Sequence, residues 1–126
     1  MYDLVFVLER MHGEVHPEWG IVRMSFLSSI FGTRSKFYWA QTAAGRFEFE
    51  FVPQWNGSIR LYINEQPSYR SRSADLQSTH RYEERGRYFV CIYDHLAPQD
   101  FNEAQSWANY FAARTSEYIL FGHPVN

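Results

Sequence analysis

The sequence predicts an α+β domain: an antiparallel, meander-like sheet of five or six strands with one C-terminal helix packed on a face. Residues 46–51 alternate strictly between phenylalanine and charged side chains, which is the period of a half-buried strand. Residues 98–122 instead place apolar side chains three and four positions apart, the period of a helix with one buried face. A chain of 126 residues has the length of one ordinary domain, so we expect a single domain over residues 1–126.

The first half of the chain predicts the strands of the meander. Residues 2–11 include five consecutive apolar side chains and indicate a buried strand. Residues 19–27 and 36–41 indicate two further strands, separated by turns that contain glycine, proline or serine. After the strand at 46–51, residues 58–64 alternate again, with their aliphatic side chains on one face.

The turn between the last two of these strands contains Asn56-Gly57. A two-residue turn there would set Phe51 opposite Tyr62 and so pair an apolar face with a polar one. A loop of three or five residues sets Phe51 opposite an inward-facing aliphatic side chain instead. We therefore predict a loop with an odd number of residues.

The last third of the chain predicts one more strand and the helix. Residues 87–93 are apolar on both faces and indicate a central strand. Asp100 and Glu103 have the spacing of a helix capping box, and Gly122 provides a stop signal. The predicted buried stripe of the helix consists of Phe101, Ala104, Ala108, Phe111, Thr115 and Tyr118.

The apolar periodicity stops between residues 65 and 86. The only aliphatic apolar side chains in these 22 residues are Ala74 and Leu76. Long segments without structure of their own are usually functional or disordered. Together with Arg87, this segment holds five of the eleven arginines, in a chain with a single lysine. A solvated loop whose arginines pair with neighbouring carboxylates is the simplest alternative to a binding site.

Arginine side chains bind phosphate and carboxylate groups bidentately and stack on flat rings. We therefore predict a small non-enzymatic binding module that uses residues 65–87. It would capture an anionic ligand (a nucleotide or nucleic-acid phosphate) or dock on a partner protein. Tyr69 would stack on the ligand and His80 would form a hydrogen bond with it. The residues assigned to this site are Tyr69, Arg70, Arg72, His80, Arg81, Arg85 and Arg87.

The alternative is a small hydrolase or transferase that uses His80 with Asp75, or Cys91 as the nucleophile. The order His80, Gly86, Cys91 resembles the approach to the reactive cysteine of ubiquitin-conjugating enzymes, and residues 45–53 are similar to their strand that ends in Phe-Pro. This resemblance would make Cys91 a thioester-forming nucleophile. It covers only these two stretches and lacks the Pro-Asn that follows the histidine, so we assign no family. A cysteine inside a predicted strand is normally a small buried hydrophobic residue.

The sequence also argues against a membrane protein, a secreted protein and a metal-binding protein. The chain has no apolar run of the roughly 18–20 residues that a membrane span requires, and its N-terminus lacks the pattern of a signal peptide. One cysteine permits no internal disulfide and suggests a reducing, cytoplasmic location. His12 and His16 have the spacing of metal ligands on a helix, but no third ligand is specified, so we predict neither a metal site nor a cofactor.

Aromatic side chains are abundant, with four tryptophans, nine tyrosines and eleven phenylalanines. This number exceeds the need of one core layer, and Trp55 in the hairpin loop is the residue most expected at the surface. We therefore expect some aromatics to cover an interface, with a partner or in a homo-oligomer such as an isologous dimer.

Overall fold

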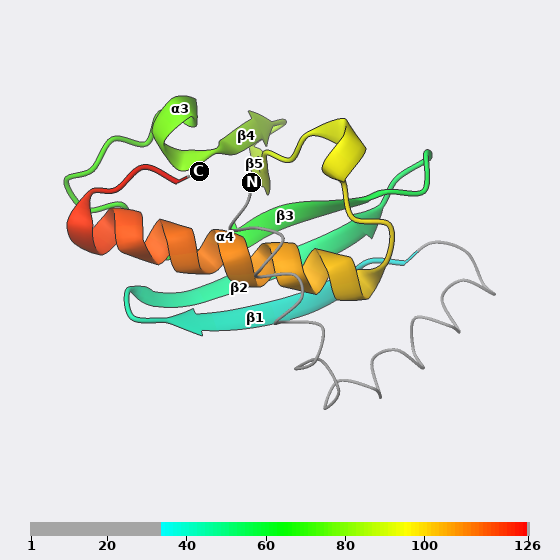
Figure 1. Cartoon of the computed structure of the whole chain (residues 1–126), viewed down its shortest axis with the longest axis horizontal. Helices are drawn as coiled ribbons and strands as arrows, with labels where there is room; N and C mark the ends of the chain where they lie inside the picture. The colour runs from blue at the N-terminus through cyan, green and yellow to red at the C-terminus, as the bar shows by residue number, and fades with distance from the viewer. Residues whose placement is uncertain (1–33, 126) are drawn as a thin grey trace.

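The computed structural model describes residues 34–125, which form an antiparallel five-stranded sheet with a long helix across one face (Figure 1). This confirms the predicted α+β class. The strands are β1 (Lys36–Thr42), β2 (Gly45–Pro53), β3 (Ile59–Glu65), β4 (Arg81–Glu84) and β5 (Arg87–Val90). The helices are α3 (Leu76–Thr79), the 3-10 turn η2 (Asp94–Leu96) and α4 (Phe101–Phe121). The strands predicted at 2–11 and 19–27, and the histidines at 12 and 16, lie outside the described residues.

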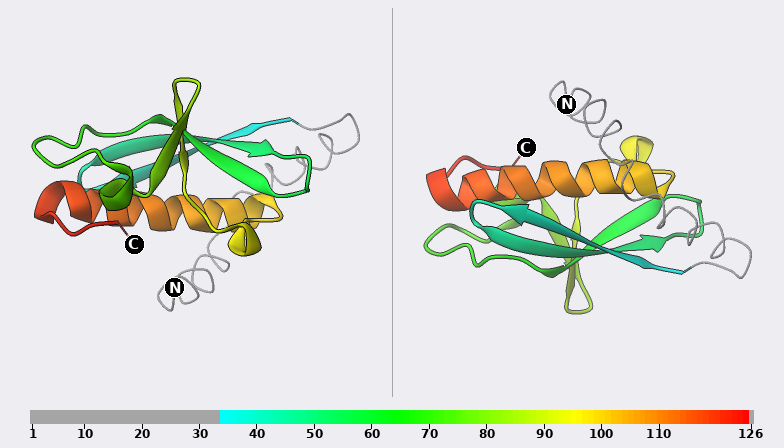
Figure 2. Two further views of the ribbon diagram at one scale, coloured as in Figure 1. Left: turned by 90° about the horizontal axis from the view of Figure 1, so that it is seen from above. Right: turned by 90° about the horizontal axis from the view of Figure 1, so that it is seen from below.

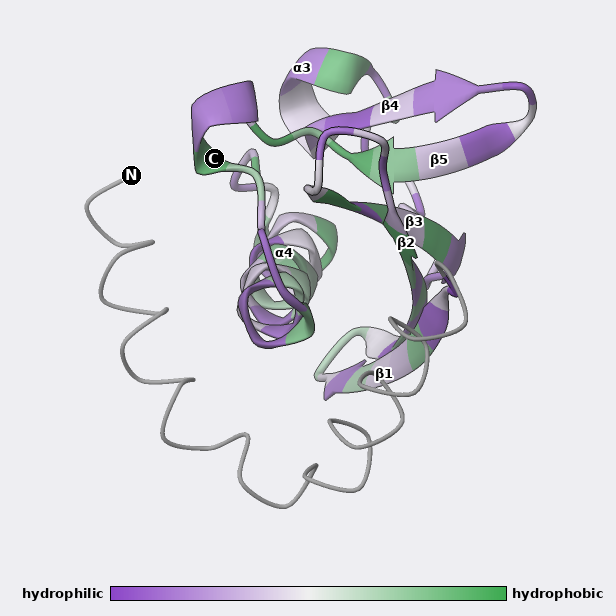
Figure 3. Cartoon of the chain, turned by 90° about the vertical axis from the view of Figure 1, so that its right-hand side faces the viewer, coloured by the Kyte–Doolittle hydropathy of each residue, from purple (hydrophilic) through white to green (hydrophobic). Residues whose placement is uncertain are grey.

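The strand order is β1-β2-β3-β5-β4. Viewed along α4, the sheet curves around one side of the helix (Figure 3). The β4–β5 hairpin projects beyond the other strands on the side away from α4 (Figure 2). The sheet therefore has one face covered by α4 and one opposite face, which we call the outer face.

The alternation in β2 sorts its side chains between these two faces. Phe47, Phe49 and Phe51 are all buried against α4, and Phe111 of the helix meets Phe49 edge-on at 6.2 Å between ring centroids. Glu48 and Glu50 point to the outer face, as the period of two requires.

The hairpin between β2 and β3 has a five-residue loop, since Pro53 pairs with Ile59. Phe51 then lies opposite Leu61, so the predicted odd loop is confirmed. Trp55 at the tip of this loop is fully exposed, also as predicted.

Helix α4 begins and ends at the predicted caps. The Asp100 carboxylate accepts a hydrogen bond from the Glu103 backbone N–H at 2.8 Å, and the Glu103 carboxylate accepts one from the Gln99 N–H. Gly122 closes the helix with φ 84°, a left-handed conformation that favours glycine. The predicted stripe is buried, except that Phe101 is half-buried.

Two expectations for the last third need correction. Residues 65–86 are not structureless, because they contain α3 and strand β4. The strand predicted at 87–93 ends at Val90. It does lie inside the sheet, between β3 and β4, and Arg85 and Gly86 form its two-residue turn with φ 53° and 79°. Strand β4 escaped prediction because its sequence Arg-Tyr-Glu-Glu shows no apolar alternation.

Candidate functional site

The seven residues predicted to bind a ligand do not converge on one site. Arg72 lies at the C-terminal end of α4. Its Nε and Nη2 donate hydrogen bonds to the carbonyl oxygens of Ile119 and Leu120, both at 3.3 Å. The last carbonyls of a helix have no partner within the helix, and a cation beside them is favoured by the helix dipole. Arg72 is therefore engaged in capping.

Arg81 and Tyr69 form part of the packed interior. The Arg81 guanidinium lies between the rings of Tyr69 and Tyr88, 4.8 and 3.6 Å from their centroids, and donates to Gln66 Oε1 at 3.3 Å. Only 8% of Tyr69 is exposed, its ring packs edge-on against Tyr118, and burial raises the pKa of its hydroxyl. Tyr69 is a core residue, so its ring is not free to stack on a ligand.

His80 and Asp75 lie at the two ends of α3. His80 adopts a left-handed conformation, and its backbone carbonyl accepts a hydrogen bond from the Cys91 N–H at 2.9 Å. Asp75 caps the other end, and hydrogen bonds from Ser73 and Ser78 lower the pKa of its carboxyl. Within residues 34–125 no hydrogen bond joins the Asp75 carboxylate to the His80 imidazole, and Cys91 is half-buried. The enzymatic alternatives stay predictions.

Arg70 and Arg85 are exposed, each with a positive φ. Among the described residues their guanidinium groups make no hydrogen bond or ion pair. Arg87 behaves differently: it projects onto the outer face of the sheet, where we find the most notable concentration of aromatic side chains.

One row of residues crosses the outer face through all five strands. The strand registers pair Phe37 with Glu50, Glu50 with Tyr62, Tyr62 with Phe89, and Phe89 with Tyr82. Four of these five side chains are aromatic. We call Phe37, Tyr62, Phe89 and Tyr82 the aromatic row.

The aromatic row is partly open to solvent. Phe37 and Tyr82, on the two edge strands, are 51% and 44% exposed. Between them, Phe89 contacts Tyr62 edge-on at 5.9 Å and Tyr82 at 5.6 Å between ring centroids. Trp39, next to Phe37 on the same face of β1, is 48% exposed.

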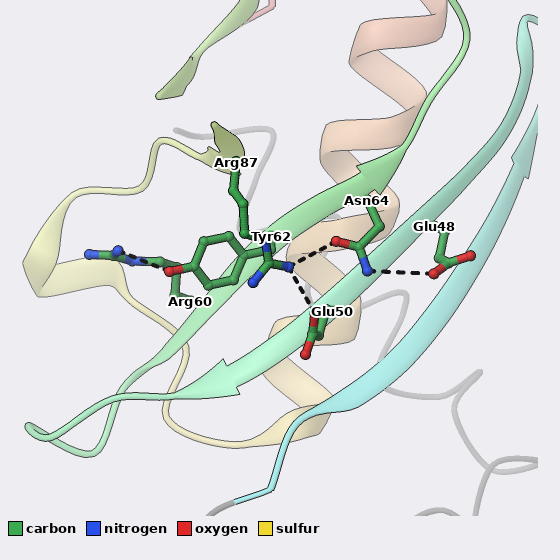
Figure 4. Close-up of polar contacts among 6 residues, drawn as sticks. All are labelled: Glu48, Glu50, Arg60, Tyr62, Asn64 and Arg87. Carbon is green, nitrogen blue, oxygen red and sulfur yellow. Dashed lines mark hydrogen bonds and ion pairs between the residues drawn. The ribbon is translucent and has the colours of Figure 1, made fainter. Parts of the chain in front are cut away.

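Arginine guanidinium groups lie over these rings. The Arg87 guanidinium is 3.9 Å from the centroid of Tyr62 and donates to Glu50 Oε1 at 2.8 Å and Asn64 Oδ1 at 2.9 Å (Figure 4). The Arg60 guanidinium is 4.1 Å from the centroid of Phe89 and forms an ion pair with Glu84. Such stacking fixes long side chains and adds cation–π attraction.

Glu50 lies between Phe37 and Tyr62 and is the one carboxylate among the five paired residues that cross the sheet. Burial acts to raise the pKa of Glu50, but hydrogen bonds from Ser35 and Arg87, together with the Arg87 charge, outweigh it and hold the pKa below its ordinary value. Glu50 therefore stays ionised and balances Arg87. Arg60 is likewise paired with Glu84, so the charges of Arg60 and Arg87 are both balanced by carboxylates.

A cleft opens beside the first half of β3, where side chains from both faces of the sheet line it. It has a volume of about 510 Å³ and lies between the first half of β3, the β4–β5 hairpin and residues 91–98. Its lining includes Arg60, Tyr82 and Phe89 of the face just described, so the cleft and the aromatic row are continuous.

Other kinds of site find no support in the described part of the chain. Residues 34–125 contain no group of three or more His, Cys, Asp or Glu side chains placed to hold a metal ion. None of their helices has the length and apolar character to cross a membrane. No protein-family model, curated protein or solved structure matches the chain.

Sequence reasoning placed the site in the arginine-rich segment and missed the outer face. Of the residues it named, only Arg87 reaches the aromatic row. The available signal was the aromatic content of the polar faces, with Phe37 and Trp39 at alternate positions of β1.

Proposed function

We propose that this protein is a small non-enzymatic module that binds a partner protein through the outer face of its sheet. The observation that carries the proposal is the aromatic row, which has one residue on each of four strands opposite α4, with Glu50 of β2 between Phe37 and Tyr62. Large aromatic and arginine side chains dominate the binding energy of protein interfaces.

The arrangement supports docking for an energetic reason. Side chains that are already stacked, as Arg60 on Phe89 and Arg87 on Tyr62, lose little conformational freedom on binding. Because the charges of both arginines are balanced by carboxylates, the surface favours a protein partner over a polyanion.

The anionic ligand was predicted from the sequence alongside partner docking, and it stays a prediction. It is less well supported, since Arg72, Arg81 and Arg87 are each held by a different part of the protein. The segment 65–87 still contributes to the proposed interface through Tyr82 and Arg87.

Site-specific photo-crosslinking tests the proposal. A photoreactive phenylalanine analogue replaces Phe37 on the outer face or, in the control, Phe121 at the end of α4, which is 66% exposed. In cells of the protein's own host, we expect a discrete crosslinked chain from position 37 and none from position 121. Crosslinking of the same chain from both positions, or from neither, would contradict the proposal.

A further inference from the structure

We infer that the cleft beside β3 binds an extended segment of the partner in which an apolar residue is flanked by basic residues. This inference rests on the proposed function, because it names the chemistry of the partner that the outer face docks. It is carried by the shape, floor and charge of the cleft.

The floor of the cleft is apolar and belongs to the core. Ile59, Leu61 and Val90 contribute to it and are 5%, 1% and 6% exposed. Phe89 and Ile92, which are half-buried, supply most of the apolar surface that remains open to a ligand. A ligand group that displaces water from this floor must itself be apolar.

The charged side chains of the cleft are mostly acidic. Glu83, Glu84 and Asp94 face a single guanidinium, that of Arg60, which gives the lining a net charge of −2. Glu84 already pairs with Arg60 at 2.8 Å. Within residues 34–125 the exposed carboxylates of Glu83 and Asp94 make no ion pair, so they are the groups left to attract a cation.

The cleft volume of about 510 Å³ lies within the range of sites that hold small ligands. In an extended chain, successive side chains point in opposite directions. An apolar residue seated on the floor therefore turns its two neighbours outward to solvent, within reach of long-range attraction by the exposed carboxylates of Glu83 and Asp94. An apolar residue between two basic ones satisfies both features, whereas a phosphate group would be repelled.

The test uses three capped tripeptides and the full chain labelled with nitrogen-15. The probe is acetyl-Arg-Leu-Arg-amide, and the matched peptides carry glutamate in place of both arginines or glycine in place of leucine. Backbone amide signals are followed during each titration. We expect the probe to shift the signals of Val90 and Ile92 and to bind about 10-fold more tightly than either matched peptide.

Charge-neutralising variants of the protein complete the test. The double variant Glu83→Gln with Asp94→Asn should weaken probe binding about 5-fold, as expected for two exposed ion pairs. Glu65→Gln, an exposed carboxylate of β3 outside the cleft lining, should leave it unchanged. Unshifted amide signals away from the substituted positions show that each variant is folded.

Four results would overturn the inference: equal or tighter binding of either matched peptide, no binding of any peptide, shifts located outside the cleft, or unchanged affinity in the double variant. Photo-crosslinking at position 37 separates this failure from that of the proposed function. If crosslinking persists while the peptides fail, only the cleft assignment is wrong. If the probe binds but no crosslink forms, the docking proposal fails and the cleft assignment stands.

Discussion

Replacing Arg72 by alanine separates a structural role from a ligand-binding role for the arginine-rich segment. The substitution removes two hydrogen bonds to the terminal carbonyls of α4, from Ile119 and Leu120, and a cation beside the negative end of the helix dipole. Both hydrogen bonds are 3.3 Å long and Arg72 is half-buried. Each bond should therefore contribute a free energy near the lower end of the range usual for protein hydrogen bonds. We expect a loss of about 2 kcal/mol in the free energy of unfolding.

The neighbouring chain remains attached in this variant, because the Tyr118 hydroxyl still donates to the Ser73 carbonyl at 2.7 Å. The loss should therefore reflect the cap and not the release of a whole segment. Arg72→Lys keeps the charge but cannot reach two carbonyls with one planar group, so we expect roughly half the loss.

Urea unfolding followed by far-ultraviolet circular dichroism measures this difference. The matched control is Arg70→Ala, since the exposed Arg70 side chain has no hydrogen bond or ion pair among residues 34–125 and should change stability by less than about 0.5 kcal/mol. Equal stability of the Arg72 and Arg70 variants would refute the capping role of Arg72.

Three further substitutions extend the account. Asp100→Ala removes the side-chain acceptor for the Glu103 N–H and should cost about 1 kcal/mol in urea unfolding; an unchanged midpoint would contradict its capping role. Arg81→Met removes the cation between two tyrosine rings and should lower stability by about 1–2 kcal/mol, whereas a variant as stable as the parent would show that the stacking contributes nothing. Because the folded pKa of Glu50 is depressed, its contribution is present above its ordinary pKa and is lost as pH falls through the lower folded value. On acidification below the ordinary pKa of 4.5, thermal unfolding of Glu50→Gln should therefore change less than that of the parent, and parallel curves would contradict this.

The parts of the fold that follow local rules could be predicted from the sequence. Phe51 needs an apolar partner, which decided the parity of the hairpin loop. Asp100, Glu103 and Gly122 marked both ends of α4 because capping depends on residues a few positions apart.

The candidate site could not be predicted in the same way, because it depends on which strands become neighbours. Tyr62 and Phe89 are adjacent only because β5 pairs with β3 and not with the edge of β1. The arginines illustrate the same limit: Arg72 donates to carbonyls 47 and 48 residues away, and Arg87 on β5 reaches Glu50 on β2 across β3. Clustering along the chain therefore did not imply clustering in space.

Native mass spectrometry of the protein purified from its own host tests the docking surface most directly. The double variant Phe37→Ser with Tyr82→Ser alters both exposed ends of the aromatic row, and Phe121→Ser changes a still more exposed aromatic residue elsewhere. If the outer face docks a partner, the parent and Phe121→Ser carry a bound protein chain that the double variant lacks; a second copy of this chain would identify that partner as itself. A bound chain retained by the double variant, or a parent protein found only as a free monomer, would contradict the account.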